Sequence, residues 1–439
     1  MKIAFYCANK HLPEIDFSEP YSGNPGCGAA EYLHIAIPFM LDNFYSKLMK
    51  TVIIADEVDK LPPNIESYKV NHGVVEAASL AKSIECDVFV FRPRMQEEDN
   101  ILSHLESIQL KSVGRAALTP NYDHLIKMGK SNYFKALICV GKNQFNHLID
   151  SPVSKKIVQI NNCISDKLIG QITNKPIFDK RKDVVFMGSL MPQKNFHYLA
   201  SVWNQISKKI PEANLHVIGS SKTYGIKENL GKFGLAEEKY EKYFMSLLNK
   251  DRISAKKVFF HGNLSFEKYK ILSNAKVGVV NPLGTTETCC VSAVEMQAMG
   301  IPVCTGNYES LRTTVINKRS GLLSKNKKQF IKNIVSVYKN KRIFNKLSEG
   351  AIINAKINFS FSHNINKWYS LFYKINNNIN FEANFFKSIF DVKSILQLLI
   401  VINTIFFRKT LGIRTFSLLK LIDLLKKIKI FLKKIILNN

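Results

Sequence analysis

Short apolar runs rich in β-branched residues alternate with stretches of helical periodicity along most of this 439-residue chain. The runs do not alternate apolar with polar positions, which is typical of strands buried on both faces of a parallel sheet. They fall at 2–8, 51–55, 87–91, 136–140, 157–160, 183–188, 214–219, 257–262, 275–281 and 301–305. The clearest helical patterns lie between them, at 29–43, 142–149, 196–209 and 291–299. This order predicts an α/β protein built on doubly wound parallel sheets.

The alternation pauses once, between Cys163 and Lys182, in a stretch that contains Gly170, Pro176 and a charged run. The pause indicates a linker over residues 166–182. We therefore expect two Rossmann-like domains, one over residues 1–165 and one over 183–358. Ligands of such sheets bind beyond the carboxyl ends of the strands, so two facing domains would form a deep cleft.

After residue 376 the pattern changes to a basic tail over 376–439. An apolar run at 395–407 is followed by apolar residues at helical spacing and many lysines over 411–437. This is typical of an amphipathic helix that lies in the headgroup region of a membrane, where each Lys adds about 1 kcal/mol. We expect an anionic membrane surface to bind residues 394–437. Packing of this face on the protein itself or on a second subunit is the alternative.

The formal net charge of +27 favours an anionic partner: a nucleic acid, a phosphorylated small molecule or an anionic membrane. Between residues 374 and 439 there are twelve Lys or Arg and three Asp or Glu, a net charge of +9. This strongest cluster lies on an apolar amphipathic pattern, which suits a bilayer better than a nucleic acid. We expect no nucleic-acid partner, and a basic nucleic-acid-binding protein remains the non-enzymatic alternative.

The eight cysteines form no CxxC pair, and several lie in apolar runs, so they are interpreted as free thiols in a reducing cytoplasm. Ligand spacing typical of a metal site is absent from the sequence, and we expect none. The first residues begin a strand and do not resemble a signal peptide. An uncharged apolar stretch of 18 residues is also lacking. The expected location is cytoplasmic, peripheral on the inner face of the cytoplasmic membrane.

The strongest candidate site lies between Asn281 and Gly300. Glu287 follows a predicted strand, and Glu295 lies about two turns into the next helix. The backbone N–H groups at that helix start form a suitable site for an anion such as a diphosphate, and Glu295 suits a ribose diol. The candidate ligand-binding residues there are Thr288, Cys289, Cys290, Val291 and Glu295. The plainer alternatives are a solvated loop acid for Glu287 and a capping-box residue, paired with Ser292, for Glu295.

Three further segments supply candidate residues. The first is a strand, glycine turn and helix start with Gly188, Ser189 and Lys194. The second is a glycine loop with Gly26, Gly28 and Glu31, where glycine permits close backbone approach. The third, at 118–124, offers Asn121 as a polar contact.

Together these segments resemble retaining GT-B glycosyltransferases of glycosyltransferase family 4 (glycosyl transferases group 1). The segment from Glu287 to Cys304 resembles the E-x7-E signature of that family. The stretch from Val184 to Leu199 resembles its G-R-L-x-x-x-K-G segment, with Ser189 in place of the usual Arg. The glycine loop resembles the G-G-x-E loop of the family. Residues 359–375 resemble the closing helix of the family, which crosses back to the first domain.

The resemblance implies the GT-B fold and a retaining, metal-independent transfer of a sugar from a nucleoside-diphosphate sugar, without any other cofactor. Glu287 would be the catalytic residue at the donor sugar, and Glu295 would bind the ribose. The diphosphate would be bound by Lys194, together with Gly188 and Ser189. The glycine loop would border both the donor phosphates and the acceptor, through Gly26, Gly28 and Glu31. Asn121 would contact the acceptor. The acceptor would be a glycan or a lipid-linked molecule in bacterial surface polysaccharide or lipopolysaccharide synthesis. A GT-B sugar-nucleotide epimerase and a non-catalytic GT-B protein remain alternatives.

Overall fold

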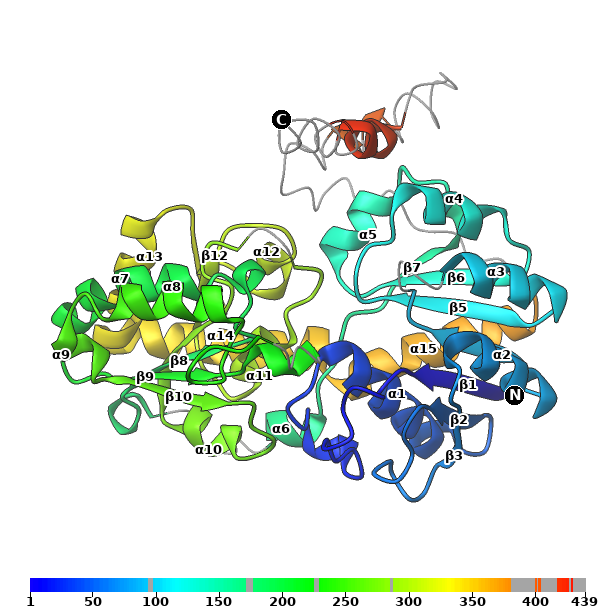
Figure 1. The fold of residues 1–439 in the computed structure, drawn as a ribbon, viewed down its shortest axis with the longest axis horizontal. Coiled ribbons are helices and arrows are strands. Elements are labelled where there is room, and N and C mark those ends of the chain that lie inside the picture. The colour runs from blue at the N-terminus through cyan, green and yellow to red at the C-terminus, as the bar shows by residue number, and fades with distance from the viewer. Residues whose placement is uncertain are drawn as a thin grey trace.

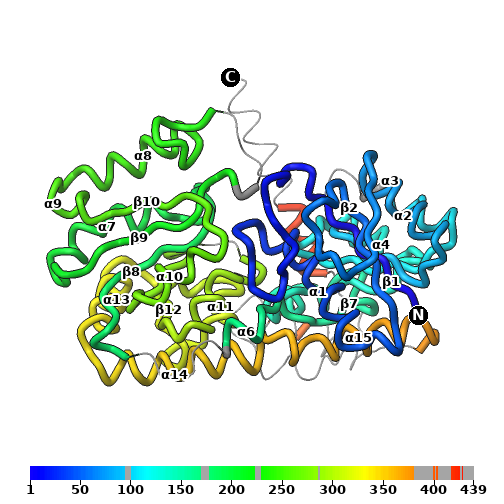
Figure 2. The backbone as a smooth tube through the Cα atoms, turned by 90° about the horizontal axis from the view of Figure 1, so that it is seen from below, coloured from blue at the N-terminus to red at the C-terminus, as the bar shows by residue number. Residues whose placement is uncertain are grey.

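The computed structural model describes residues 1–93, 98–170, 177–224, 229–284, 287–379, 399–400, 402–403, 417–425 and 428. These residues form two α/β domains side by side, with a pair of long helices running beneath both (Figures 1 and 2). The predicted doubly wound architecture is confirmed.

The N-terminal domain contains a parallel sheet that, in the described residues, has seven strands in the order β3-β2-β1-β4-β5-β6-β7. The strands are β1 (Lys2–Cys7), β2 (Lys50–Ala55), β3 (Glu66–Lys69), β4 (Val88–Phe91), β5 (Lys111–Ala116), β6 (Phe134–Cys139) and β7 (Ile157–Gln159). The helices are α1 (Ala29–Tyr45), α2 (Gly73–Ser83), α3 (Glu98–Ser107), α4 (Tyr122–Lys130), α5 (Lys142–Leu148) and α6 (Asp166–Gly170). Separate clusters of buried apolar side chains pack on the two faces of this sheet, because successive side chains of a strand point to opposite faces.

The second domain repeats the plan with, among the residues that the structure describes, six parallel strands in the order β10-β9-β8-β11-β12-β13. The strands are β8 (Asp183–Met187), β9 (Leu215–Ile218), β10 (Val258–Gly262), β11 (Ala275–Val279), β12 (Val303–Gly306) and β13 (Gly321–Ser324). The helices are α7 (Phe196–Lys209), α8 (Glu238–Leu248), α9 (Arg252–Ala255), α10 (Lys268–Ser273), α11 (Val291–Ala298), α12 (Leu311–Thr314) and α13 (Lys327–Lys339). Apolar clusters again cover both faces.

The chain returns to the N-terminal domain through α14 (Lys341–Phe359) and α15 (Phe361–Asn376). The turn between them is tied to the chain after β7, because Ile164 donates its N–H to the Phe359 carbonyl at 2.8 Å and accepts from Phe361 N at 3.0 Å. Trp368 of α15 is buried against Phe5 of β1. The two domains are therefore joined by two chain segments, which limits the ways in which they can move relative to one another.

Three strands were missed by the sequence prediction, and each lacks a long apolar run. The edge strand β3 has the sequence Glu-Ser-Tyr-Lys, β5 contains Lys, Ser, Gly and Arg, and β13 is only four residues long. Pairing with neighbouring strands places them in the sheets in spite of their composition.

Most of the expected tail 394–437 lies outside the described residues. Of its described part, residues 418–425 are helical and lie beside α5 (red in Figure 1). Asp150, buried just after α5, accepts from Leu418 N at 2.8 Å through its carboxylate and from Ser417 Oγ at 2.9 Å through its carbonyl. Ile400 is buried in the same apolar cluster of the N-terminal domain. In the described residues, no helix is long and apolar enough to cross a bilayer.

Candidate functional site

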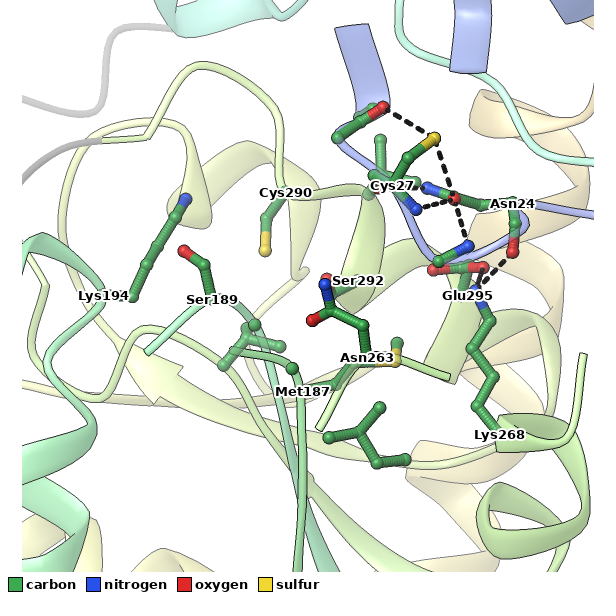
Figure 3. Close-up of a pocket in the computed structure, with 18 of the residues that line it drawn as sticks. Asn24, Cys27, Met187, Ser189, Lys194, Asn263, Lys268, Cys290, Ser292 and Glu295 are labelled. Atoms are coloured by element: carbon green, nitrogen blue, oxygen red, sulfur yellow. Dashed lines mark hydrogen bonds and ion pairs between the residues drawn. The ribbon is translucent and has the colours of Figure 1, made fainter. Parts of the chain in front are cut away.

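A cleft of about 810 Å³, open to solvent, lies between the two domains. In the second sheet it lies at the carboxyl ends of β8 and β11, where the strand order changes direction. Open α/β sheets bind their ligands at such a point. Its walls carry candidate residues from both domains (Figure 3), among them Gly26, Gly28, Gly188, Ser189, Lys194, Glu287, Cys289, Cys290, Val291 and Glu295.

Glu287 lies on the loop after β11, and its carboxylate is held by two donors. Asn281 Nδ2 donates to Glu287 Oε2 at 2.7 Å, and Lys194 Nζ lies 2.8 Å from the same oxygen. Lys194 ends the short 3-10 helix η4 (Pro192–Lys194), directly after the β8 turn. The side chain of Glu287 is only 9% exposed, so it is not the solvated loop acid of the plainer alternative. The two segments that the sequence singled out separately thus meet at one ion pair.

Glu295 lies on the second turn of α11 and is buried. Its Oε1 lies 3.0 Å from Lys268 Nζ and accepts from Tyr269 OH at 3.1 Å. Burial, followed by the charge of Glu295, raises the pKa of Tyr269 well above its usual range, so this hydroxyl remains a donor. Cys290 is the N-cap of α11 and makes no side-chain capping bond. The capping-box interpretation of Glu295 is therefore wrong.

Lys268 is a site residue that the sequence analysis missed. Its ammonium donates to the Asn24 carbonyl at 2.7 Å as well as pairing with Glu295, so it joins the two domains (Figure 3). Its side chain is 4% exposed. In sequence it is one lysine in the polar stretch Phe-Glu-Lys-Tyr-Lys, and only the packing of α10 against the glycine loop distinguishes it.

The glycine loop reaches across to the second domain. Gly26 has a φ of +97°, and a Cβ there would lie 2.6 Å from the Leu264 carbonyl oxygen, so only glycine fits this approach. The Asn24 side chain closes the loop by accepting from Gly26 N at 2.9 Å and Cys27 N at 3.0 Å. Gly28 is the N-cap of α1.

The start of α11 faces the cleft between the two glutamates. Cys289 and Cys290 are buried there, and burial, with the charge of Glu287 as the second cause, raises the pKa of both thiols, that of Cys289 to about 12. The thiols are therefore neutral near pH 7, and the polar groups offered to a ligand are backbone N–H groups. Thr288 Oγ1 donates to the Ala117 carbonyl at 2.7 Å, which ties this loop to the N-terminal domain.

Besides Thr288, two further candidates are absent from the described lining of this cleft. Asn121 is the N-cap of α4, where its side chain accepts from His124 N at 2.9 Å. Glu31 is buried on α1 and pairs with Arg92, with Nη1 to Oε1 at 2.5 Å. Neither lines the interdomain cleft in the part of the chain that the structure describes.

Lys194 and Lys268 are the cationic side chains that line the cleft among the described residues. Ser189 lines it beside Lys194 and adds no charge (Figure 3). No group of three or more His, Cys, Asp or Glu residues that could hold a metal ion occurs within the described ranges. The positive potential that this protein itself provides near Glu287 therefore comes from Lys194 and the N-terminus of α11.

Comparison with known proteins gives two findings. Residues 171–356 match the family model described as glycosyl transferases group 1. No curated protein matches the sequence.

Several solved structures share the fold. A glycosyltransferase from Rickettsia africae has a TM-score of 0.65 at 14% identity, covering 86% of this chain and 99% of that one. HepE from Anabaena, solved with UDP and glucose, has a TM-score of 0.59 at 15% identity (85% and 99% covered). The lipopolysaccharide outer core galactosyltransferase WaaB has a TM-score of 0.56 at 14% identity (85% and 99% covered).

Proposed function

We propose that this chain, which has the GT-B fold and whose residues 171–356 match the model of the glycosyl transferases group 1 family, is a glycosyltransferase. It would transfer a sugar from a nucleoside-diphosphate sugar with retention of anomeric configuration. The observation that carries the proposal is the Lys194–Glu287 pair beside the N-terminus of α11, with Glu295 buried further along the same cleft. Donor phosphates would lie at the helix start and donor ribose near Glu295.

The proposed reaction breaks the bond between the anomeric carbon and the leaving phosphate through an oxocarbenium-like state. Negative charge grows on the departing nucleoside diphosphate, and Lys194 with the α11 N–H groups stabilises it without a metal ion or other cofactor. The carboxylate of Glu287 faces the donor sugar and favours its cationic character. The leaving phosphate takes the acceptor's proton, and the closed domains exclude water.

The nucleotide specificity can be tested by thermal unfolding in the presence of UDP-, GDP-, ADP- and CMP-sugars. One nucleotide is expected to raise the Tm by several degrees, because a ligand at 100 times its Kd adds about 2.7 kcal/mol of stability. The matched control is Glu295→Ala, in which the same donor should give a much smaller shift. The absence of a shift with every donor would contradict the proposal.

We further propose that the acceptor is a glycan or a lipid-linked molecule used in surface polysaccharide or lipopolysaccharide synthesis. The protein would bind this acceptor at the inner face of the cytoplasmic membrane. The supporting observation is the tail helix, which is fixed to the acceptor-side domain through Asp150 and leaves apolar side chains open. Its exposed residues are Leu421, Leu424, Leu425 and Ile428, each about half exposed. Such a face, next to many lysines, suits an anionic bilayer better than a nucleic acid.

Replacing Leu421, Leu424 and Leu425 together by serine is expected to lower the fraction bound to anionic vesicles at least about tenfold, since each half-exposed leucine gives up roughly 1 kcal/mol of burial. Flotation with phosphatidylglycerol vesicles measures this. The control is serine at Ile253, Ile353 and Ile357, which are similarly or more exposed on the second domain and α14. Equal loss in both variants, or full binding of the tail variant, would refute a membrane role for this face.

A further inference from the structure

The loop that follows β12 has a strained backbone. Glu309 has a φ of +41°, in the left-handed region that residues with a side chain rarely adopt. Leu283, in the loop after β11, has a φ of +52°. The two loops pack together, because a Cβ on Gly306 would lie 2.7 Å from the Leu283 Cα. Such strain persists only where the surrounding contacts impose it, so the contacts of these loops show which interactions maintain it.

The side chain of Glu309 binds the other domain. Asn143 Nδ2 of α5 donates to Glu309 Oε2 at 2.7 Å, and His147 Nδ1, one helical turn further on, lies 4.0 Å from the same oxygen. Asn143 is buried, while the side chain of Glu309 is 42% exposed. Helix α12 begins two residues after Glu309, and α5 and α12 lie on facing sides of the two domains (Figure 1). A carboxylate that water could solvate is thus held across the domain interface.

The same loop contacts the main chain of the proposed catalytic residue. Ser310 N, next to Glu309, donates to the Glu287 carbonyl at 3.4 Å. Gly141, the N-cap of α5, packs against the following peptide, because a Cβ there would lie 2.3 Å from the Thr288 carbonyl oxygen. Helix α5 therefore contacts this segment directly at Thr288 and, through Glu309 and Ser310, at Glu287 itself.

These contacts differ from those that hold the carboxylate of Glu287. Lys194 and Asn281, which bind that carboxylate, belong to the second domain. They fix the side chain within its own domain but do not fix its distance from the N-terminal domain. That distance depends on contacts across the interface, to which Glu309 contributes a charge-assisted hydrogen bond and Thr288 Oγ1 a neutral one.

We propose that Glu309 is a positioning residue for sugar transfer, which sets the place of Glu287 relative to the acceptor-side domain by binding Asn143 across the interface. The inference rests on the proposed function, in which Glu287 is catalytic. If the domains moved apart, Glu309 would lose Asn143 and keep a strained backbone, so the bond belongs to the closed state. Because the carboxylate is partly exposed, water weakens the bond, and the expected effect on the rate is moderate.

Hydrogen exchange followed by mass spectrometry tests the positioning without any substrate. Glu309→Ala should raise the exchange rate of the peptide that carries Glu287 and Thr288 by about threefold or more, because it removes a link to α5. The matched control is Glu57→Gln, since Glu57 is 37% exposed and pairs with Lys69 at 2.8 Å outside the cleft lining. Faster exchange confined to the loop after β12, with an unchanged rate in the Glu287 peptide, would overturn the inference.

Release of UDP from UDP-glucose separates positioning from stability. Glu309→Ala should lower kcat about three- to tenfold and leave the KM for UDP-glucose nearly unchanged, because the donor contacts of the second domain remain. Glu309→Gly should be equally slow and yet at least as stable as Glu309→Ala in thermal unfolding, since glycine adopts a positive φ without strain.

An exchanged pair tests the bond itself. Asn143→Asp places a second carboxylate against Glu309 and should lower kcat at least as much as Glu309→Ala. Adding Glu309→Gln to Asn143→Asp restores an amide–carboxylate bond with donor and acceptor exchanged, and kcat should return to within about threefold of wild type.

A role in stability alone predicts a different pattern, in which Tm follows the bond while kcat per folded molecule stays constant. That pattern, or an exchanged pair as slow as Asn143→Asp, would contradict the proposal. If wild-type protein binds no sugar nucleotide and releases no UDP, the proposed function fails. Hydrogen exchange would then still report whether Glu309 holds the segment that carries Glu287.

Discussion

Glutamine in place of Glu287 is expected to lower kcat by about 10²- to 10³-fold while changing donor affinity only a few-fold, the size of effect found when one preorganised electrostatic group is removed. Glutamine keeps the shape of the side chain and an oxygen that can still accept from Asn281 Nδ2, now 2.7 Å away. What is lost is the negative charge that the proposed reaction has beside the donor sugar, where it matters most when that sugar becomes cationic. Single-turnover kinetics and equilibrium donor binding measure the two quantities separately.

Lys194→Gln is the matched comparison, since it removes the other member of the same 2.8 Å pair. Here both donor affinity and kcat should fall, because in the proposed reaction the lysine contacts the diphosphate before and during its departure. Ser189→Arg in the Lys194→Gln background should restore part of the activity, because residue 189 lines the same end of the cleft (Figure 3). A Glu287→Gln variant that loses donor affinity but keeps its turnover would refute the catalytic role.

Much of the site was predictable because its residues follow buried strands. The loops after β8 and β11 bring Lys194 and Glu287 to the same sheet edge, and strand burial is visible in sequence as an apolar run. The other predicted positions that line the cleft are Gly26 and Gly28 of the glycine loop and Cys289, Cys290 and Val291 at the start of α11. Asn281, which fixes the carboxylate of Glu287, lies within the predicted segment, yet its role depends on a positive φ of 37° that sequence patterns do not reveal.

What could not be predicted depends on contacts between distant segments. Lys268 and Tyr269 hold Glu295 only because α10 packs beside α11 and against the glycine loop. Arg115 is buried on a strand that the pattern missed, and it donates to Asn162, whose side chain contacts the Cys289 carbonyl of the second domain. Asn121 was predicted to contact the acceptor. In the structure its side chain accepts a hydrogen bond from His124 N in the first turn of α4, a short-range interaction that asparagine favours. Local sequence patterns therefore predicted the cleft residues that follow strands better than the contacts between domains that complete the cleft.

Lys268→Met is expected to lower the free energy of unfolding by about 3–5 kcal/mol, because it leaves the buried carboxylate of Glu295 without its cation. The side chains of Lys268 and Glu295 are 4% and 5% exposed and their charged atoms lie 3.0 Å apart, so little water reaches the carboxylate in place of the lost ammonium. The variant also loses the 2.7 Å bond to the Asn24 carbonyl, which joins the two domains. Denaturant unfolding followed by circular dichroism measures the change.

The double variant Lys268→Met with Glu295→Leu separates the cost of leaving a buried charge unpaired from the cost of lost side-chain packing. Because it leaves neither charge buried, it should recover most of the stability lost in Lys268→Met. It should still fail to bind the donor, since Glu295 is the proposed ribose ligand. Glu241→Gln is a suitable control, because that carboxylate is equally buried but accepts backbone N–H groups far from the cleft, at Phe233 and Leu235, both 2.8 Å away. Its donor binding should be normal whatever its stability. Strong donor binding by the double variant would mean that Glu295 serves the fold alone, as one half of a buried ion pair.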